Sequence, residues 1–151
     1  MWRPGRRMFT LSCILILLAA AAHNTGFLML KATGPEDEKV LDAMKGFHNP
    51  MGMGMSPSFF DIFLALAFTM TVLMVALGVM GLVLAASRSV SSDVIRTLTW
   101  LYLVWVAAFI AEGVYYRVPP PIIFGALIEA SLVAALLTGK EGNDKAMSAS
   151  A

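Results

Sequence analysis

Four stretches of the chain are long, apolar and nearly free of charged residues. They cover residues 8–30, 59–87, 94–116 and 122–138. A helix rises about 1.5 Å per residue, so about 20 apolar residues are enough to cross the hydrocarbon core of a bilayer. The pattern therefore predicts an all-α integral membrane protein, a four-helix bundle in which residues 1–138 form the membrane domain.

The first stretch also has features of a cleaved leader. Arg3, Arg6 and Arg7 precede it, and four small residues at 19–22 lie within it, as in a secretory signal peptide. Apolar residues resume at 26–30, however, and make the run long enough to span a membrane. We expect a retained first span, with cleavage as the alternative.

The longest connection, residues 31–57, carries signals for a helix of its own. Pro35 suits a first helical position, the acids at 36–38 suit the positive end of a helix, and Gly46 suits its termination. The apolar residues that recur at helical spacing are Val40, Leu41, Met44 and Phe47. This pattern predicts a short external amphipathic helix that lies at the outer interface or caps the bundle.

The remaining connections are short. Three consecutive prolines at 119–121 predict an extended, stiff reversal, which makes spans three and four an antiparallel hairpin. Residues 139–151 are polar and rich in small side chains, which predicts a disordered cytoplasmic tail.

Lysine and arginine residues set the expected orientation, because they are enriched in cytoplasmic loops. With the N-terminus in the cytoplasm, that side receives Arg3, Arg6, Arg7, Arg88, Arg96, Lys140 and Lys145. The opposite side receives Lys31, Lys39, Lys45 and Arg117. We expect a multi-pass protein of the cell (inner) membrane with both termini in the cytoplasm.

Composition narrows the class of protein further. Hydrophobic residues make up 58% of the chain and charged residues 14%, whereas a soluble domain carries roughly 25% charged residues. A single cysteine excludes an internal disulfide framework. A net charge of +1, without a sustained basic patch beyond residue 7, argues against nucleic-acid binding. The expected partners are the lipid bilayer, other membrane-protein subunits, or a second copy of the chain.

Four ionisable residues lie inside the apolar stretches, where a charge costs about 2.5–3.5 kcal/mol at the bilayer centre. They are His23, Asp61, Glu112 and Glu129. Asp61 follows Ser58 at the spacing of a capping box, which predicts a helix cap. The others fall in the predicted outer half or middle of the bilayer, and we expect an outward polar pocket. Its candidate ligand or proton-binding residues are His23, Glu112, Tyr116, Arg117 and Glu129.

A structural alternative stays open for each pocket residue. Glu112 would pair with Arg117 or His23, and His23 would bond a backbone carbonyl or a tyrosine across the bundle. Glu129 would be a protonated carboxyl hydrogen-bonded to another helix.

A second candidate site lies in the loop, in the sequence from His48 to Met55. His48, Met51, Met53 and Met55 offer an imidazole and soft thioethers, which suit Cu(I). The alternative is a flexible loop that lies along the membrane surface.

The residue inventory argues against an enzyme. Cys13 has no partner for a redox disulfide, and the spans hold one histidine rather than the two of a haem site. No zinc-binding His-Glu-x-x-His sequence or phosphate-binding glycine loop occurs. We predict no catalytic residues and no cofactor.

Three segments resemble a known group of proteins. They are His23-Asn-Thr-Gly26, the Pro35-Glu-Asp-Glu opening that leads to Ala43-Met44-Lys45, and Ser58-Phe-Phe-Asp61 with the apolar stretch up to Gly78. Over roughly half of the chain this is similar to a group of small four-transmembrane-helix bacterial inner-membrane proteins with no assigned activity. The resemblance implies four spans and a bacterial membrane, and it implies no substrate.

Three hypotheses for function follow. The first is an accessory or interaction subunit that packs in a membrane complex or homo-oligomer. The second is a small-ligand or proton-coupled binding or transport unit that uses the polar pocket. The third is an enzyme or metal handler, the latter through external copper binding by the Met-rich loop.

Overall fold

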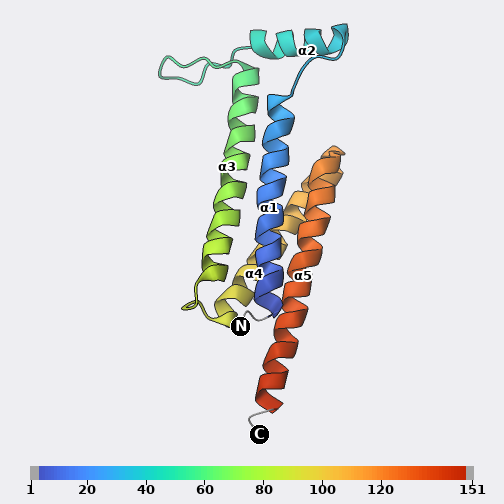
Figure 1. Cartoon of the computed structure of the whole chain (residues 1–151). Coiled ribbons are helices and arrows are strands. Elements are labelled where there is room, and N and C mark those ends of the chain that lie inside the picture. Colours follow the sequence, from blue (N-terminus) through green and yellow to red (C-terminus); the bar gives the residue numbers. More distant parts are fainter. Residues whose placement is uncertain (1–3, 149–151) are drawn as a thin grey trace. The chain divides into compact units, whose positions relative to one another are not determined.

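The computed structural model describes the backbone of residues 4–148 and the side chains of residues 5–139. It contains five helices in this part of the chain (Figure 1): α1 Pro4–Leu28, α2 Pro35–Gly46, α3 Phe59–Ala86, α4 Ser92–Tyr116 and α5 Pro119–Ser148. Four of them, all but α2, are long and apolar enough to cross a membrane. The described residues form no strand, only two isolated bridges. The predicted all-helical fold is therefore confirmed, as are four helices that are long and apolar enough to cross a membrane.

The chain divides into two compact units, which are described separately. The first unit comprises residues 1–19 and 74–151, and the second comprises residues 20–73. Helices α1 and α3 each contribute one part to the first unit and the other part to the second.

The first unit is a bundle of the N-terminal part of α1, the C-terminal part of α3, and helices α4 and α5 (Figure 1). Its fully buried side chains come from all four segments, and the largest are Phe9, Ile16, Met74, Val106, Ile128 and Leu132. The rings of Phe9 and Tyr102 lie 5.4 Å apart between centroids. Because lipid is as apolar as these side chains, close packing rather than exclusion from water holds such helices together.

Two side-chain hydrogen bonds join helices of this bundle, the first buried and the second partly buried. The hydroxyls of Ser12 on α1 and Ser131 on α5 lie 2.7 Å apart. The Tyr102 hydroxyl on α4 donates to the Leu77 carbonyl on α3 at 2.8 Å. Such bonds contribute about 0.6 kcal/mol on average between membrane helices, so they specify which faces meet more than they stabilise the bundle.

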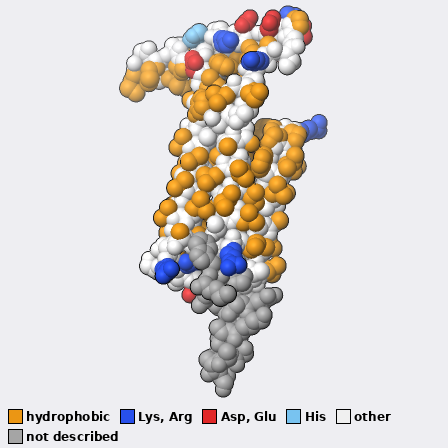
Figure 2. Space-filling model, viewed as in Figure 1, with side chains coloured by type: hydrophobic (Ala, Val, Ile, Leu, Met, Phe, Trp, Pro, Cys, Tyr) orange, Lys and Arg blue, Asp and Glu red, His pale blue; other side chains and the backbone are white. Residues whose placement is uncertain are grey.

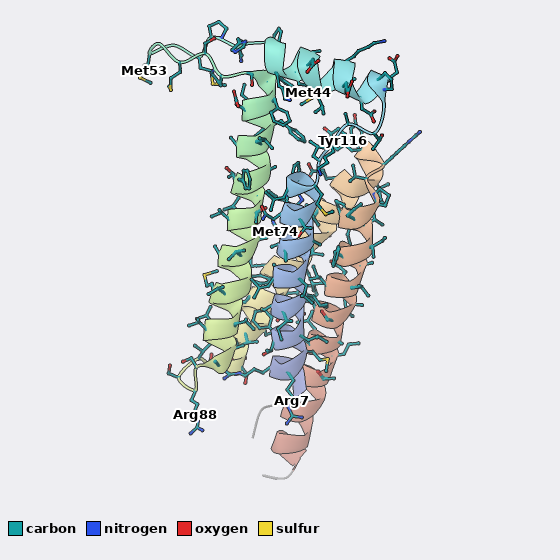
Figure 3. All side chains as sticks on the ribbon, turned by 45° about the horizontal axis from the view of Figure 1, so that its top comes forward. Arg7, Met44, Met53, Met74, Arg88 and Tyr116 are labelled. Carbon is teal, nitrogen blue, oxygen red and sulfur yellow. The ribbon has the colours of Figure 1, made fainter. Side chains whose placement is uncertain are left out.

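Arg6, at the start of α1, forms hydrogen bonds to the connection between α3 and α4. Its guanidinium donates to the carbonyl of Ser87 at 2.8 Å and also to the carbonyl of Val90. Figure 3 shows that Arg7 and Arg88 lie at the same end of this unit, and that Tyr116 lies at the other. Figure 2 shows hydrophobic side chains over the visible sides of the helices in this unit and Lys or Arg side chains near its ends.

We predict that Arg6→Gln lowers the stability of the protein, by about 1–3 kcal/mol, because it removes two charge-assisted hydrogen bonds. Thermal unfolding in detergent, followed by tryptophan fluorescence, measures the loss. The matched control is Arg7→Gln, since the Arg7 side chain is exposed, and it should change stability by less than about 0.5 kcal/mol. Equal losses in the two variants would contradict the assignment.

Two segments, the prolines at 119–121 and the residues after 138, differ from what the sequence predicts. The prolines at 119–121 form the first turn of α5 and not an extended reversal, so that prediction was wrong. The backbone N–H groups in the first turn of a helix have no acceptor within the helix. Proline, which lacks this N–H, is therefore well tolerated at a helix start. The reversal is made instead at Arg117, which has left-handed backbone angles of φ 57° and ψ 40°. Beyond it, α5 continues as a helix through Ser148, past the predicted start of a disordered tail at 139, and residues 149–151 lie outside the described residues.

The second unit contains α2 and the start of α3. Helix α2 has the predicted bounds, Pro35–Gly46, and none of its residues is buried. Near its start, the hydroxyl and the backbone N–H of Thr33 donate to Asp37, which holds the pKa of that carboxyl below its usual range. The placement of α2 at an outer membrane interface stays a prediction.

The predicted capping box at the start of α3 is confirmed. The backbone N–H and the hydroxyl of Ser58 donate to the Asp61 carboxylate at 3.0 and 2.6 Å. In return, the Asp61 N–H donates to the Ser58 hydroxyl oxygen at 3.1 Å. Asp61 is therefore a structural residue, and its position at the helix end explains a carboxylate beside an apolar stretch.

Candidate functional site

An open groove runs between α4 and α5 in the first unit. It encloses about 540 Å³. Helix α4 contributes Arg96, Trp100, Leu103, Val104 and Ala107 to its lining, and α5 contributes Glu129, Val133, Leu136 and Leu137. We refer to this feature as the α4–α5 groove.

The helical repeat explains why these residues share a groove. Positions 96, 100, 104 and 107 fall on one face of α4, and positions 129, 133, 136 and 137 fall on one face of α5. The groove extends along α4 for about three turns, or roughly 16 Å at 1.5 Å per residue. Because the two helices run antiparallel, Glu129 lies toward the Ala107 end of the groove and Arg96 lies at the other end.

Glu129 is the polar group that the groove leaves unsatisfied. Its Oε2 atom is buried and has no hydrogen-bond partner in the described part of the chain. A buried polar group without a partner costs about 1–3 kcal/mol. Apart from Arg96 at the other end and the indole N–H of Trp100, the groove lining is apolar, and no ion pair joins Glu129 and Arg96 among the described side chains.

The residues that share a groove with Glu129 in the structure differ from those of the predicted pocket. Glu112 is exposed on α4, and Tyr116 and Arg117 are exposed at the end of that helix. None of these three residues lines the α4–α5 groove. Tyr116 instead packs its ring against Tyr115, with 4.8 Å between centroids. Their role in a pocket stays a prediction.

His23 belongs to the second unit and lies in an aromatic cluster there. Its ring is 4.7 Å from that of Phe27, which in turn is 5.3 Å from the ring of Phe63. The Nε2 atom of His23 is buried and has no partner among the described residues. The imidazole is thus held by ring contacts, and the predicted hydrogen bond to a carbonyl or tyrosine is not formed at that atom.

The Met-rich loop also lies in the second unit. Met51, Met53 and Met55 are exposed, and the Nδ1 atom of His48 lies 3.0 Å from the carbonyl of Gly46. Among the described residues, no group of three or more His, Cys, Asp or Glu side chains is placed to hold a metal ion. Any metal site in this loop therefore depends on thioether sulfur.

Sequence reasoning missed Arg96 and Trp100 as residues that line the same groove as Glu129. The signal available was the repeat of every third or fourth position from Arg96 to Ala107, which marks a continuous face of α4. A repeat does not reveal which neighbouring helix that face meets, and this decides whether it lies near Glu129.

A scan against models of protein families, a search of curated proteins and a search of solved structures each find no match. The resemblance to small bacterial inner-membrane proteins stays a prediction. We therefore infer function from the α4–α5 groove and its carboxyl.

Proposed function

We propose that this protein is an accessory subunit that packs laterally against a transmembrane helix, either of a larger membrane complex or of a second copy of itself. The α4–α5 groove is the contact surface. The proposal includes a bacterial inner-membrane location, which rests on the sequence resemblance. It also places both termini in the cytoplasm, an orientation that the distribution of Lys and Arg residues supports.

The observation that carries the proposal is the unpartnered Oε2 atom of Glu129 in a groove with mostly apolar walls. A lipid acyl chain fills apolar space, but it has no donor for a carboxyl oxygen. A neighbouring helix that carries a hydroxyl, amide or basic side chain supplies one once the Glu129 side chain turns toward the groove, because Oε2 is closed to outside contact in this conformation. Ionisable residues inside membrane segments almost always face a protein or water-filled interior, not lipid.

The form of the groove supports a helix as its occupant. It is about three turns long, and the small side chain of Ala107 lies at the level of Glu129. Small residues let two helix backbones approach closely, which strengthens packing and brings polar groups within hydrogen-bond distance.

A small amphipathic ligand with a hydrogen-bond donor is the second candidate. The groove volume of about 540 Å³ lies within the usual range of ligand pockets, about 300–1,000 Å³. Such a ligand would place its donor at Glu129 and its apolar part against Trp100 and Leu136.

A photoreactive amino acid placed in the groove tests the proposal. We predict that a probe at Val104 or Leu137 forms one discrete protein adduct in intact membranes, and that Glu129→Leu abolishes it. The control position is Val79 on α3, which is also exposed but lies outside the groove. The mass of the adduct distinguishes a second copy from another subunit.

Three results would contradict the proposal. Adducts to lipid alone would show that no protein occupies the groove, and an adduct to a small molecule would favour the ligand. Equal protein crosslinking from Val104 and Val79 would show that the groove is not the contact surface.

A further inference from the structure

The loop before α3 is folded into a hairpin, which we call the Met hairpin and define as residues 47–58. Its two arms are joined by backbone hydrogen bonds, from Asn49 N–H to the Pro57 carbonyl at 3.0 Å and from Met51 N–H to the Met55 carbonyl at 3.1 Å. Phe59 N–H closes the base by donating to the Phe47 carbonyl at 2.8 Å. The hairpin is therefore an ordered element and not an open loop.

The tip of the hairpin is a tight turn. Gly52, Met53 and Gly54 have φ angles of 81°, 48° and 76°, and Met55 N–H donates to the Gly52 carbonyl at 3.0 Å. Glycine adopts such angles readily, whereas a residue with a side chain pays about 1–2 kcal/mol for left-handed backbone. This turn holds Met53 at the apex, with 94% of the residue exposed (Figure 3).

The other two methionines are brought together by the same turn. Met51 and Met55 lie on the two arms, which are joined by the bond from the Met51 N–H to the Met55 carbonyl, and Met55 is bridged to Gly52 at the tip. Both are more than half exposed, and Met53 is two positions from each. One exposed tip of five consecutive residues therefore carries three flexible thioethers.

We propose that Met51, Met53 and Met55 form a binding site for Cu(I). Thioether sulfur is a soft ligand that selects Cu(I), whereas carboxylate and carbonyl oxygen suit Mg²⁺ and Ca²⁺. The Met hairpin contains no Asp or Glu residue, so it lacks the carboxylates that usually hold hard divalent ions. The site binds the ion in its reduced form, and no electron transfer is involved.

His48 is not a ligand in this site, although the sequence groups it with the three methionines. It pairs with Ser58 across the hairpin, and Ser58 is three positions from Met55 along the same arm. Since successive residues of an extended arm point to opposite faces, the His48–Ser58 pair and Met55 lie on opposite faces. The proposed donor set is therefore sulfur alone.

Cu(I) titration of the purified full-length protein tests the proposal, under anaerobic conditions with a chromogenic Cu(I) chelator as competitor. We expect one bound Cu(I) per chain, and Zn²⁺ should not compete. Each of Met51→Leu, Met53→Leu and Met55→Leu should weaken binding by about tenfold or more, the scale on which changes around a metal lower its affinity. Leucine keeps the side chain apolar but removes the sulfur.

The matched controls are Met44→Leu, which removes a thioether from α2 of the same unit, and His48→Ala. Both should bind Cu(I) as the unchanged protein does. The proposal is overturned if the unchanged protein does not bind Cu(I) in competition with the chelator, or if Met44→Leu weakens binding as much as the hairpin variants. An equal loss in His48→Ala would overturn the sulfur-only donor set. Circular dichroism of each variant confirms that the helices remain folded.

Discussion

Replacing Glu129 with Leu is expected to raise the free energy of unfolding of the isolated protein by about 1–3 kcal/mol and to abolish its association with the partner helix. The gain arises because the buried Oε2 atom of Glu129 has no hydrogen-bond partner within the described chain. The loss of association arises because the partner's donor would then face an apolar side chain. Chemical or thermal unfolding in detergent measures the first effect, and crosslinking from the α4–α5 groove measures the second.

Two further variants sharpen this prediction. Glu129→Gln keeps a side-chain oxygen that accepts a hydrogen bond, so it should retain part of the association. Glu112→Gln is the matched control, because Glu112 is an exposed carboxylate outside the groove, and it should change neither property. A loss of stability in Glu129→Leu would contradict the account, since it would mean that the carboxyl is a structural hydrogen-bonding group within the bundle.

Gly81→Ala is expected to destabilise the bundle of the first unit, by about 1–3 kcal/mol, the typical cost of overpacking a core. A Cβ atom at Gly81 would clash with the sulfur of Cys13 and lie 3.2 Å from the Tyr102 hydroxyl. Alanine favours a helix over glycine by up to about 1 kcal/mol, so the steric cost decides the sign. Thermal unfolding in detergent measures the change.

The matched control for this prediction is Gly26→Ala in α1, where an added Cβ would meet nothing within 4 Å. That variant should be neutral or slightly stabilised. Cys13→Ala removes the clashing sulfur, so Gly81→Ala should cost less in that background, with a coupling energy above about 0.5 kcal/mol in a double-mutant cycle. Equal costs in both backgrounds would show that the two helices do not approach each other closely at this point.

The sequence predicts those parts of the fold that depend on local signals. Apolar runs locate all four helices that are long enough to span a membrane, because that property needs only length and composition. The bounds of α2 follow from Pro35 and Gly46, and the cap of α3 follows from the spacing of Ser58 and Asp61. Each of these signals is complete within a few residues, so no knowledge of the neighbouring helices is required.

The lining of the candidate site could not be predicted in the same way. Glu129 was identified by its depth in an apolar run, but its neighbours depend on how α4 and α5 are rotated about their axes. That rotation results from contacts far apart in the sequence, such as the hydrogen bond between Ser12 and Ser131. The sequence does not predict the helix start at Pro119, because consecutive prolines are compatible both with an extended segment and with the first turn of a helix.

The mass of the protein extracted with its native lipids tests the central claim most directly. Native mass spectrometry of polymer-enclosed membrane discs gives that mass without dissociating lateral contacts. The account predicts a complex of fixed stoichiometry for the unchanged protein and for Glu112→Gln, and a single 16.2 kDa chain with lipid for Glu129→Leu. A single chain with lipid in all three samples would contradict the proposal that the α4–α5 groove holds a partner helix.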